Sequence, residues 1–186
     1  MKNLLTKINN LLIINPKIFF DPRGYFMESF RQDDFEKRVG EINFVQENES
    51  CSSFGVLRGL HFQKEPYAQS KLVRCVVGKI LDVAVDVRKG SPTFGKYETV
   101  ELSDENKKQF FIPKGFAHGF LALSEKVIVQ YKVDNYYAPQ AEAGILWNDP
   151  AVGIDWQLDK YGITSPLLSE KDCRYPSLKE YLKEGK

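Results

Sequence analysis

Residues 72–87 read LVRCVVGKILDVAVDV, in which two apolar runs flank a Gly-Lys pair. In the second run, the odd-numbered positions from 81 to 87 hold Leu or Val and the even-numbered ones hold Asp or Ala. This period of two is typical of a β-strand, whose side chains alternate between two faces. A two-residue loop that begins with glycine suits a type II′ turn, so we expect the two runs to form a β-hairpin.

Similar patterns continue on both sides of this stretch. We expect further strands over residues 11–14, 18–20, 25–30, 44–48, 56–63, 97–102, 109–112, 116–123 and 127–133. Many short strands joined by Gly, Pro and polar turns favour a sandwich or a jelly-roll barrel. The sequence therefore predicts a mainly β fold.

Helical periodicity appears only in short pieces. Residues 33–40 predict a helix over one sheet edge, which Asp33 can cap and Gly40 can end. A second helix is expected over 178–183, where Leu178, Tyr181 and Leu182 share a face. Between residues 136 and 156 the chain is rich in aromatic residues, and we expect this part to wrap over the barrel.

The composition sets limits on the class of protein. With 186 residues, 42% of them hydrophobic, we expect one domain over residues 1–186. The formal net charge of +1, with both signs interspersed, argues against a nucleic-acid partner. No apolar run is long enough to span a membrane, and the N-terminus lacks a signal-peptide pattern, so we expect a cytoplasmic protein with no membrane partner.

The three cysteines, Cys51, Cys75 and Cys173, are widely spaced and form no Cys-x-x-Cys pair. This pattern is typical of reduced, inert thiols rather than of disulfides. A catalytic cysteine would need a histidine partner, and the sequence alone leaves that reading open.

The chain contains two histidines, His61 in GVLRGLHFQ (residues 55–63) and His118 in IPKGFAHGF (residues 112–120). Strict alternation places Arg58 and His61 on opposite faces of a strand. A glycine inside a strand often marks a bulge, so Gly59 could bring both side chains inward. Whether Arg58 and His61 face the same ligand stays open at this point.

Three interpretations compete for His61. An isolated histidine on a half-buried strand is most often a core residue with its hydrogen bonds satisfied. A metal site would need His61, His118 and a carboxylate as a facial triad, but two distant imidazoles are few ligands, and Gln63 stands where a second close histidine would be expected. We therefore predict no metal and no cofactor.

Acid–base chemistry on an organic substrate is the third interpretation. His61 can accept a proton near neutral pH if a carboxylate fixes its tautomer, and the phenol of Tyr131 can donate one. The ammonium of Lys71 can stabilise an enolate oxygen. Each of these side chains also has a plain structural alternative, Tyr131 as a core residue and Lys71 as a solvated one.

Basic and amide side chains add a further indication. A diphosphate with polar attachments would suit a set made of Arg23, Arg58, Lys71, His118, Gln46 and Asn48. The chain has no glycine-rich phosphate loop of the Walker or Rossmann kind, so side chains would have to bind the phosphates.

Segments along nearly the whole chain resemble those of the dTDP-4-dehydrorhamnose 3,5-epimerases, cupin-fold enzymes of nucleotide-sugar biosynthesis. The matching segments are DPRGYFMESF (21–30), FVQEN (44–48), VLRGLHFQ (56–63), KLVR (71–74), IPKGFAHGF (112–120), QYK (130–132), WNDP (147–150), IDW (154–156) and LSEKD (168–172). Little can be matched over residues 64–70 and 157–166, which could alter the substrate or its access.

The resemblance implies a cupin-type jelly-roll barrel and a cofactor-independent isomerase that acts on C3 and C5 of dTDP-4-dehydro-6-deoxy-D-glucose. It implies that His61 is the general base, that Asp172 is its partner in a dyad, and that Tyr131 returns a proton to the opposite face. Lys71 is similar to the lysine that steadies the enolate at O4. The implied substrate-binding set is Arg23, Glu28, Gln46, Asn48, Arg58, Lys71, His118, Tyr137, Glu142 and Lys171, with Tyr137 stacking on thymine.

The resemblance also implies a homodimer with exchanged strands, in which Arg58 could serve its own site or the partner's. Two alternatives stay open. Similar enzymes with the same base and acid act at only C3 or only C5, or on another nucleotide sugar, and a non-catalytic cupin that binds a sugar nucleotide is the alternative from a different class. One sequence does not separate them, and the rates and the final polysaccharide product stay equally open.

Overall fold

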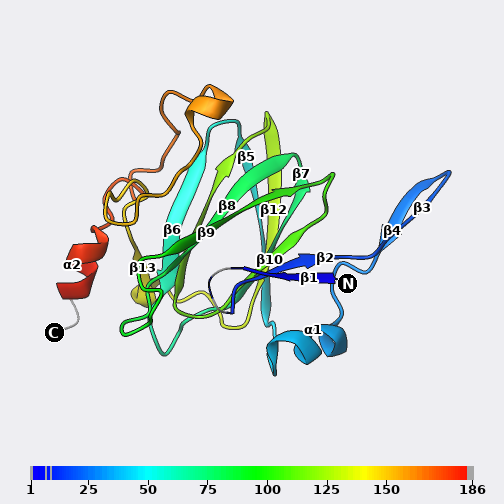
Figure 1. The fold of residues 1–186 in the computed structure, drawn as a ribbon, viewed down its shortest axis with the longest axis horizontal. Helices are drawn as coiled ribbons and strands as arrows, with labels where there is room; N and C mark the ends of the chain where they lie inside the picture. Colours follow the sequence, from blue (N-terminus) through cyan, green and yellow to red (C-terminus); the bar gives the residue numbers. More distant parts are fainter. Residues whose placement is uncertain (1, 7, 9, 184–186) are drawn as a thin grey trace.

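The computed structural model describes residues 2–6, 8 and 10–183, and two sheets of antiparallel strand pairs dominate this part of the chain (Figure 1). The six-stranded sheet has the order β1 (Lys2–Leu5), β2 (Leu12–Asn15), β10 (Gln109–Ile112), β7 (Lys71–Val77), β12 (Lys126–Val133) and β5 (Gln46–Ser53). The five-stranded sheet has the order β13 (Glu142–Gly144), β6 (Leu57–Gln63), β11 (Phe116–Ala122), β8 (Lys79–Asp86) and β9 (Tyr97–Ser103). The predicted mainly β fold is confirmed.

An apolar interior lies between the two sheets. Val73, Phe110 and Val129 of the six-stranded sheet belong to the same buried cluster as Leu102 and Phe116 of the five-stranded sheet. Because side chains alternate along a strand, the neighbouring residues point outward and need covers of their own. Two further apolar clusters, one on each outer face, supply those covers.

Residues 72–87 do not form the predicted hairpin. β7 lies between β10 and β12, whereas β8 lies between β11 and β9 in the other sheet. Gly78, with a φ of 75°, carries the chain from one sheet to the other, and a Cβ there would lie 2.3 Å from the carbonyl oxygen of Lys126. Both faces of β8 are buried, so the strand packs as an inner member of its sheet, and a short Gly-x loop serves such a corner as well as a hairpin.

The N-terminal helix α1 (Gln32–Val39) differs from the prediction at its start. Arg31 occupies the N-cap position without a side-chain cap, and Asp33 lies in the first turn, 2.6 Å from Arg31. A missing cap costs about 1 kcal/mol, whereas burial of a side chain such as Phe35 contributes about 2 kcal/mol, so packing outweighs capping. Phe35 packs on the outer face of the six-stranded sheet rather than on its edge, and Gly40 ends the helix as predicted.

The C-terminal part of the chain covers the outer face of the five-stranded sheet, as the aromatic content predicts. Trp156 and Ile163 are buried there against the outward side chains of β8. Helix α2 (Leu178–Lys183) has the predicted bounds. Leu178 is buried, but Leu182 is exposed, so the predicted apolar face is shorter than expected. Two short 3-10 helices, Pro139–Ala141 and Asp159–Tyr161, also lie in this part.

A third, two-stranded sheet of β3 (Ile18–Asp21) and β4 (Gly24–Met27) forms an arm that extends away from the barrel, on the side opposite α2 (Figure 1). The turn at residues 21–24 is the predicted one. Large apolar side chains on the arm are exposed, Phe20 to 78%. An exposed aromatic surface of this kind is unusual on an isolated chain.

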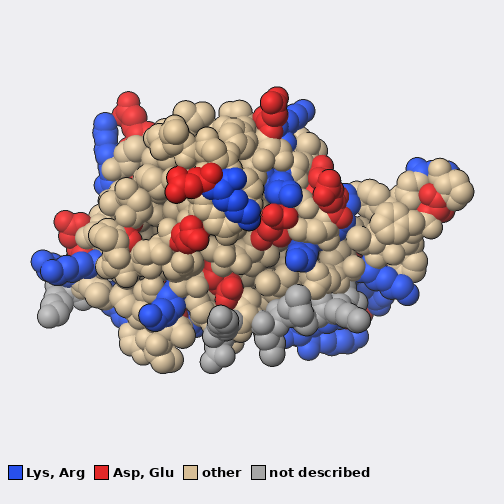
Figure 2. Space-filling model, turned by 45° about the horizontal axis from the view of Figure 1, so that its top comes forward, with Lys and Arg blue, Asp and Glu red and all other residues tan. Residues whose placement is uncertain are grey.

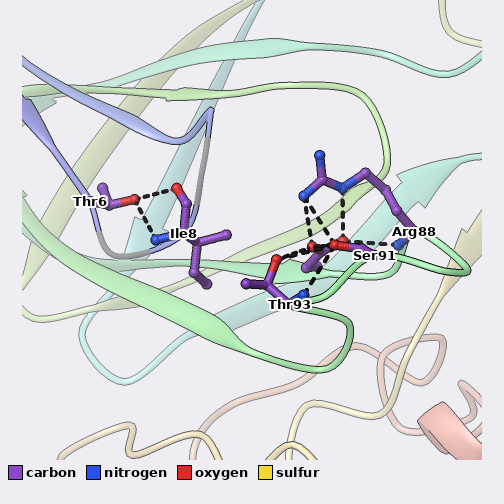
Figure 3. Close-up of polar contacts among 6 residues, drawn as sticks. Thr6, Ile8, Arg88, Ser91 and Thr93 are labelled. Atoms are coloured by element: carbon purple, nitrogen blue, oxygen red, sulfur yellow. Dashed lines mark hydrogen bonds and ion pairs between the residues drawn. The ribbon is translucent and has the colours of Figure 1, made fainter.

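Polar contacts fix the loop that follows β8. The carboxylate of Asp86 accepts hydrogen bonds from Arg88, from Ser91 (2.6 Å) and from Thr93 (2.6 Å), and Figure 3 shows these three partners converging. Burial would raise the pKa of Asp86, but the hydrogen bonds outweigh it and hold the pKa at about 2. The same view shows Thr6 bound to the backbone of Ile8. These contacts stabilise loops.

The surface charges are mixed. Figure 2 shows acidic and basic side chains interspersed on the face it presents, as the mixing of both signs along the sequence predicts. Within the described residues, neither helix is long and apolar enough to cross a membrane.

Candidate active site

Two adjoining cavities lie between the sheets. The larger has a volume of about 460 Å³ and the smaller of about 250 Å³. His61, Lys71 and Tyr131 line both, so the cavities adjoin at these three side chains and we treat them as one site. His61 belongs to the five-stranded sheet, whereas Lys71 and Tyr131 belong to the six-stranded one. A molecule in this site would meet side chains from both sheets.

Arg58 and His61 both line the larger cavity, although strict alternation places them on opposite faces. The reason is a shift of register in β6. His118 of β11 pairs with His61, but Phe120 pairs with Arg58, so two residues of β6 lie opposite one residue of β11. Leu60 then points into the outer apolar cluster, and both polar side chains point inward.

Glycines on both strands allow this bulge. Gly59 has a φ of 125°, and a Cβ there would lie 2.5 Å from the Cα of Gly119. A Cβ at Gly119 would lie 2.6 Å from the carbonyl oxygen of Arg58. The two backbones therefore approach more closely than any other residue would permit. The interpretation of Gly59 as a bulge that turns Arg58 inward is confirmed.

His61 and Asp172 form a pair, with 2.5 Å between His61 Nε2 and Asp172 Oδ1. The hydroxyl of Ser169 donates to the other carboxylate oxygen at 2.7 Å. Burial would raise the pKa of Asp172, but hydrogen bonds from His61 and Ser169 outweigh it and lower the pKa. An ionised carboxylate on Nε2 fixes the proton there and leaves the lone pair on Nδ1, which is the form that can accept a proton.

His118 and Asp82 form a second pair, with 2.7 Å between His118 Nε2 and Asp82 Oδ1. Both side chains are buried, although His118 lines the larger cavity. Burial lowers the pKa of His118, against the opposing effect of Asp82, and burial raises the pKa of Asp82. This imidazole is thus held neutral, as a hydrogen-bonding group.

Lys71 begins β7 and is buried at the centre of the site. Its ammonium donates to the backbone carbonyl of His61 at 3.4 Å. Burial lowers the pKa of Lys71 to about 8, while Asp82 and Glu142 act in the opposite direction. At pH 7 such an amine is about 90% protonated, so it can stabilise negative charge in the cavity.

Tyr131 lies on β12, in the sheet that faces His61. Burial raises the pKa of its phenol, although Arg58 opposes this effect. The hydroxyl is therefore protonated at neutral pH and can donate a proton.

Amide and phenol groups line the smaller cavity. Gln46 donates to Asn48 at 2.7 Å, and its carbonyl oxygen accepts the backbone N–H of Tyr137 at 3.1 Å. The exposed ring of Tyr137 lies at the rim, and its hydroxyl donates to Glu142 at 2.8 Å. Lys171 also donates to Glu142. These contacts bring five of the predicted binding residues to one end of the site.

Arg23 and Glu28 are not brought to either cavity of this chain. Arg23 lies in the turn of the arm, with a side chain 89% exposed and 2.6 Å from Asp21. Glu28 follows the arm, 4.0 Å from Arg31.

Several site residues escaped the sequence analysis. Ser169 sits three positions before Asp172, a spacing that suits a local hydrogen bond, and Asp82 is a carboxylate within an apolar strand. In the sequence, Ser169 and Asp82 each gave only a weak indication that they belong to the site. The ring of Tyr175 lies against His61, and nothing in the sequence pattern indicates that contact.

Metal and thiol chemistry were the other possibilities. Among the described residues, no group of three or more His, Cys, Asp or Glu side chains is placed to hold a metal ion. Cys75 is buried, and burial raises the pKa of its thiol to about 12. Cys51 and Cys173 are exposed, and neither lines the larger cavity.

Comparison with known proteins gives consistent results. The family model described as dTDP-4-dehydrorhamnose 3,5-epimerase matches residues 5–180. The chain is 56% identical to a dTDP-4-dehydrorhamnose 3,5-epimerase of Shigella flexneri, over 92% of this chain and 93% of that one. A dTDP-6-deoxy-D-glucose-3,5-epimerase of Legionella pneumophila, solved with dTDP-4-keto-L-rhamnose, is 47% identical with a TM-score of 0.91, over 96% of this chain and 93% of that one. A 3'-monoepimerase of Streptomyces bikiniensis, solved with dTDP-quinovose, is 35% identical with a TM-score of 0.90, over 97% and 89%.

Proposed function

Because this chain belongs to the dTDP-4-dehydrorhamnose 3,5-epimerase family, we propose that its two adjoining cavities hold one molecule of dTDP-4-dehydro-6-deoxy-D-glucose and invert C3 and C5. The chain is an isomerase, and its barrel is the cupin-type jelly roll of the family, as predicted. The product, dTDP-4-dehydro-L-rhamnose, is the precursor of dTDP-L-rhamnose.

One observation carries the proposal. A histidine paired with an ionised carboxylate lies on one sheet, a protonated tyrosine lies on the facing sheet, and both line the same space. Inversion of a carbon centre requires removal of a proton from one face and delivery to the other. His61 and Tyr131 supply these two functions from opposite sides of the site.

The mechanism follows from the acidity of carbons next to a ketone. His61 takes the proton from C3 or C5, and the electron pair of the C–H bond moves into an enolate at C4 and O4. Tyr131 then protonates the same carbon from the opposite face, and the enolate returns to the ketone. The imidazolium loses a proton to solvent and the phenolate gains one, which restores both groups. Because the ketone is already present, no electrons are exchanged with a redox cofactor.

Lys71 would stabilise the negative charge that develops on O4. Its ammonium is buried, and a charge in a site shielded from water interacts more strongly than a solvated one. This role replaces the Lewis acid that a metal enzyme would use. Arg58 and His118 would bind polar groups of the sugar and of the diphosphate.

The smaller cavity would bind the nucleotide end of the substrate. Gln46, Asn48 and Glu142 offer amide and carboxylate groups there, Lys171 of the adjoining cavity donates to Glu142, and the exposed ring of Tyr137 can stack on thymine. Two cavities that share lining residues suit a substrate with a sugar part and a nucleotide part.

We further propose that the protein acts as a homodimer in which each arm completes the partner's site. This proposal is supported by the exposed aromatic side chains of the arm, which extends away from the barrel (Figure 1), and by Arg23, which lies in the turn of the arm and lines neither cavity of its own chain. In the dimer, Arg23 and Glu28 would bind the partner's substrate, whereas Arg58 would serve its own site.

Mixing two inactive variants tests the exchange. A dimer of one Arg23→Ala protomer and one His61→Asn protomer has one intact site if the arm serves the partner, and activity should rise to roughly a quarter of wild type after random exchange of subunits. If the arm serves its own chain, mixing restores nothing and the exchange is refuted.

A single-carbon epimerase is the second candidate, favoured by the similarity to the Streptomyces bikiniensis 3'-monoepimerase. Incubation with dTDP-4-dehydro-6-deoxy-D-glucose in deuterated water separates the two. Deuterium at both C3 and C5 supports the double epimerase, deuterium at one carbon supports the alternative, and deuterium at neither refutes both. The cytoplasmic location stays a prediction, which fractionation of the producing cells would check.

A further inference from the structure

The carboxylate that pairs with His61 comes from residues 169–175, which we call the dyad segment. This segment lies outside the barrel strands and must be held in register with β6. Asp172 forms one attachment, through His61. A second attachment runs through Glu142, the first residue of β13, which accepts hydrogen bonds from Lys171 and, at 3.3 Å, from the hydroxyl of Tyr175.

Tyr175 contacts His61 directly. The centroids of the two rings are 5.4 Å apart, and their planes meet at 61°. This is the range in which aromatic rings interact favourably edge to face. The imidazole is therefore fixed at two places, at Nε2 by Asp172 and on its ring by Tyr175. The nitrogen that remains for proton transfer is Nδ1.

The neighbouring strand leaves room for this ring. Gly144 pairs with His61 across β13 and β6, and a Cβ at Gly144 would lie 2.6 Å from the ring of Tyr175. The backbone N–H of Leu146 donates to the carbonyl of Pro176 at 2.9 Å, directly after the tyrosine. The ring is thus bounded by Gly144 and by His61, and the backbone directly after it is tied to Leu146.

We infer that Tyr175 is a positioning residue, whose ring holds the imidazole of His61 in the orientation needed for proton transfer, while its hydroxyl adds only a minor attachment to Glu142, at the end of the site that carries Tyr137. This inference rests on the proposed function for its kinetic consequences. Glu142 joins the two ends because its carboxylate also accepts the hydroxyl of Tyr137 at 2.8 Å.

The electrostatics agree with this arrangement. Burial, together with the neighbouring carboxylate of Glu142, raises the pKa of Tyr175, so its hydroxyl stays a donor. Burial would raise the pKa of Glu142, but hydrogen bonds from Lys171 and Tyr137 outweigh it and lower the pKa. Glu142 is therefore an ionised acceptor for its partners.

Three substitutions separate the ring from its hydroxyl. Tyr175→Phe keeps the ring and should retain kcat within about twofold, whereas Tyr175→Leu and Tyr175→Ala should lower kcat roughly tenfold with KM changed by less than about threefold, because a misplaced base slows proton transfer more than binding. Tyr161→Ala is the matched control, since Tyr161 is a partly buried tyrosine of the C-terminal part packed away from the cavities. Equal kcat in all four variants would overturn the inference.

A second readout does not depend on turnover. The chain has two histidines, so ¹H–¹⁵N spectra of the imidazoles contain one signal set for His61 and one for His118. In Tyr175→Leu and Tyr175→Ala, the Nε2–H signal of His61 should shift and exchange faster with water, while that of His118 stays unchanged as an internal control. Tyr175→Phe should leave both unchanged. A His61 signal identical to wild type in the Leu and Ala variants would refute the positioning role.

Failure of the proposed function can be distinguished from failure of the inference about Tyr175. If the wild-type protein does not exchange C3 or C5 protons, the proposed function fails, but the spectra still test whether Tyr175 orients His61. If the wild-type protein is active but neither kcat nor the His61 signal changes in the Tyr175→Leu and Tyr175→Ala variants, the inference alone fails.

Discussion

The site contains two histidine–aspartate pairs that are chemically alike and physically different. The side chain of His61 is 32% exposed and its partner Asp172 comes from the dyad segment, whereas the side chain of His118 is 8% exposed and its partner Asp82 is fully buried on β8. Hydrogen bonds lower the pKa of Asp172 despite its burial, but burial raises the pKa of Asp82. The first aspartate is thus a stable anion beside an accessible imidazole.

The difference shows how two pairs of the same residue types can serve different purposes. Asp172, a charged partner that Ser169 helps to stabilise, binds Nε2 of His61 and leaves Nδ1 as the nitrogen that can accept a proton. A pair enclosed by the barrel avoids charge, because separating charges in a poorly polarisable interior is costly. His118 therefore suits recognition of a polar substrate group, and His61 suits proton transfer.

The largest expected effect, which tests the comparison of the two histidine–aspartate pairs, is on turnover. His61→Asn should lower kcat about a thousandfold or more, since it removes the base, while His118→Asn should lower kcat only about tenfold. Steady-state kinetics with dTDP-4-dehydro-6-deoxy-D-glucose measures both, and binding of dTDP by calorimetry serves as the control for folding. Equal losses in the two variants would contradict the division of roles.

Lys71 should have the next largest effect. Lys71→Met should lower kcat about a hundredfold, because it removes the cation that stabilises the enolate. In the wild-type protein, kcat/KM should fall as the pH rises through about 8, because the ammonium of Lys71 is lost there. A pH profile that stays flat from pH 7 to roughly 9.5 would remove Lys71 from this role.

Asp172→Asn should lower kcat about thirtyfold, less than loss of the histidine itself, because an amide no longer stabilises the imidazolium but still fills the space. Ser169→Ala, which removes one donor to the same carboxylate, should have a smaller effect, about threefold. Kinetics on both variants ranks these contributions. A larger loss from Ser169→Ala than from Asp172→Asn would contradict the account.

The smallest expected effect is on stability. Because the pKa of Asp82 is raised in the folded protein, the native state binds more protons than the unfolded state above pH 3.8, so this group's contribution to stability falls as the pH rises through its folded pKa. Asp82→Asn removes this dependence. The melting temperature of the variant should therefore change less between acidic and neutral pH than that of wild type, by a few degrees. Identical pH dependence would show that Asp82 does not titrate in this way.

Much of the barrel could be predicted from alternation alone. The strands at residues 109–112 and 116–122 match their predicted ranges closely, because both are short, mostly apolar runs separated by a Pro-Lys-Gly turn. Alternation does not indicate which strands pair with each other, however, so the corner at Gly78 was wrongly predicted as a hairpin turn. The three-residue strand β13 carries no period that a sequence could reveal.

The site residues could be predicted to a different extent from the barrel strands. Gly59 indicated a bulge, but only the register against β11 places Arg58 and His61 in one cavity. Asp172 was named through resemblance, since nothing in composition separates it from the other acids. Tyr175 could not be found, because its contact depends on the path of β13 past Gly144. The position of Arg23 in a complete site stays a prediction about the partner chain.

The central claim is that base and acid act from opposite sheets on opposite faces of the sugar. Tyr131→Phe in deuterated water tests it most directly, by NMR of the substrate and product over time. We expect deuterium to enter at the carbons next to the ketone with retained configuration, because His61 still removes and returns protons on its own face, while the L-configured product forms at less than about one hundredth of the wild-type rate. Formation of that product at a rate near wild type, or loss of all exchange, would contradict the claim.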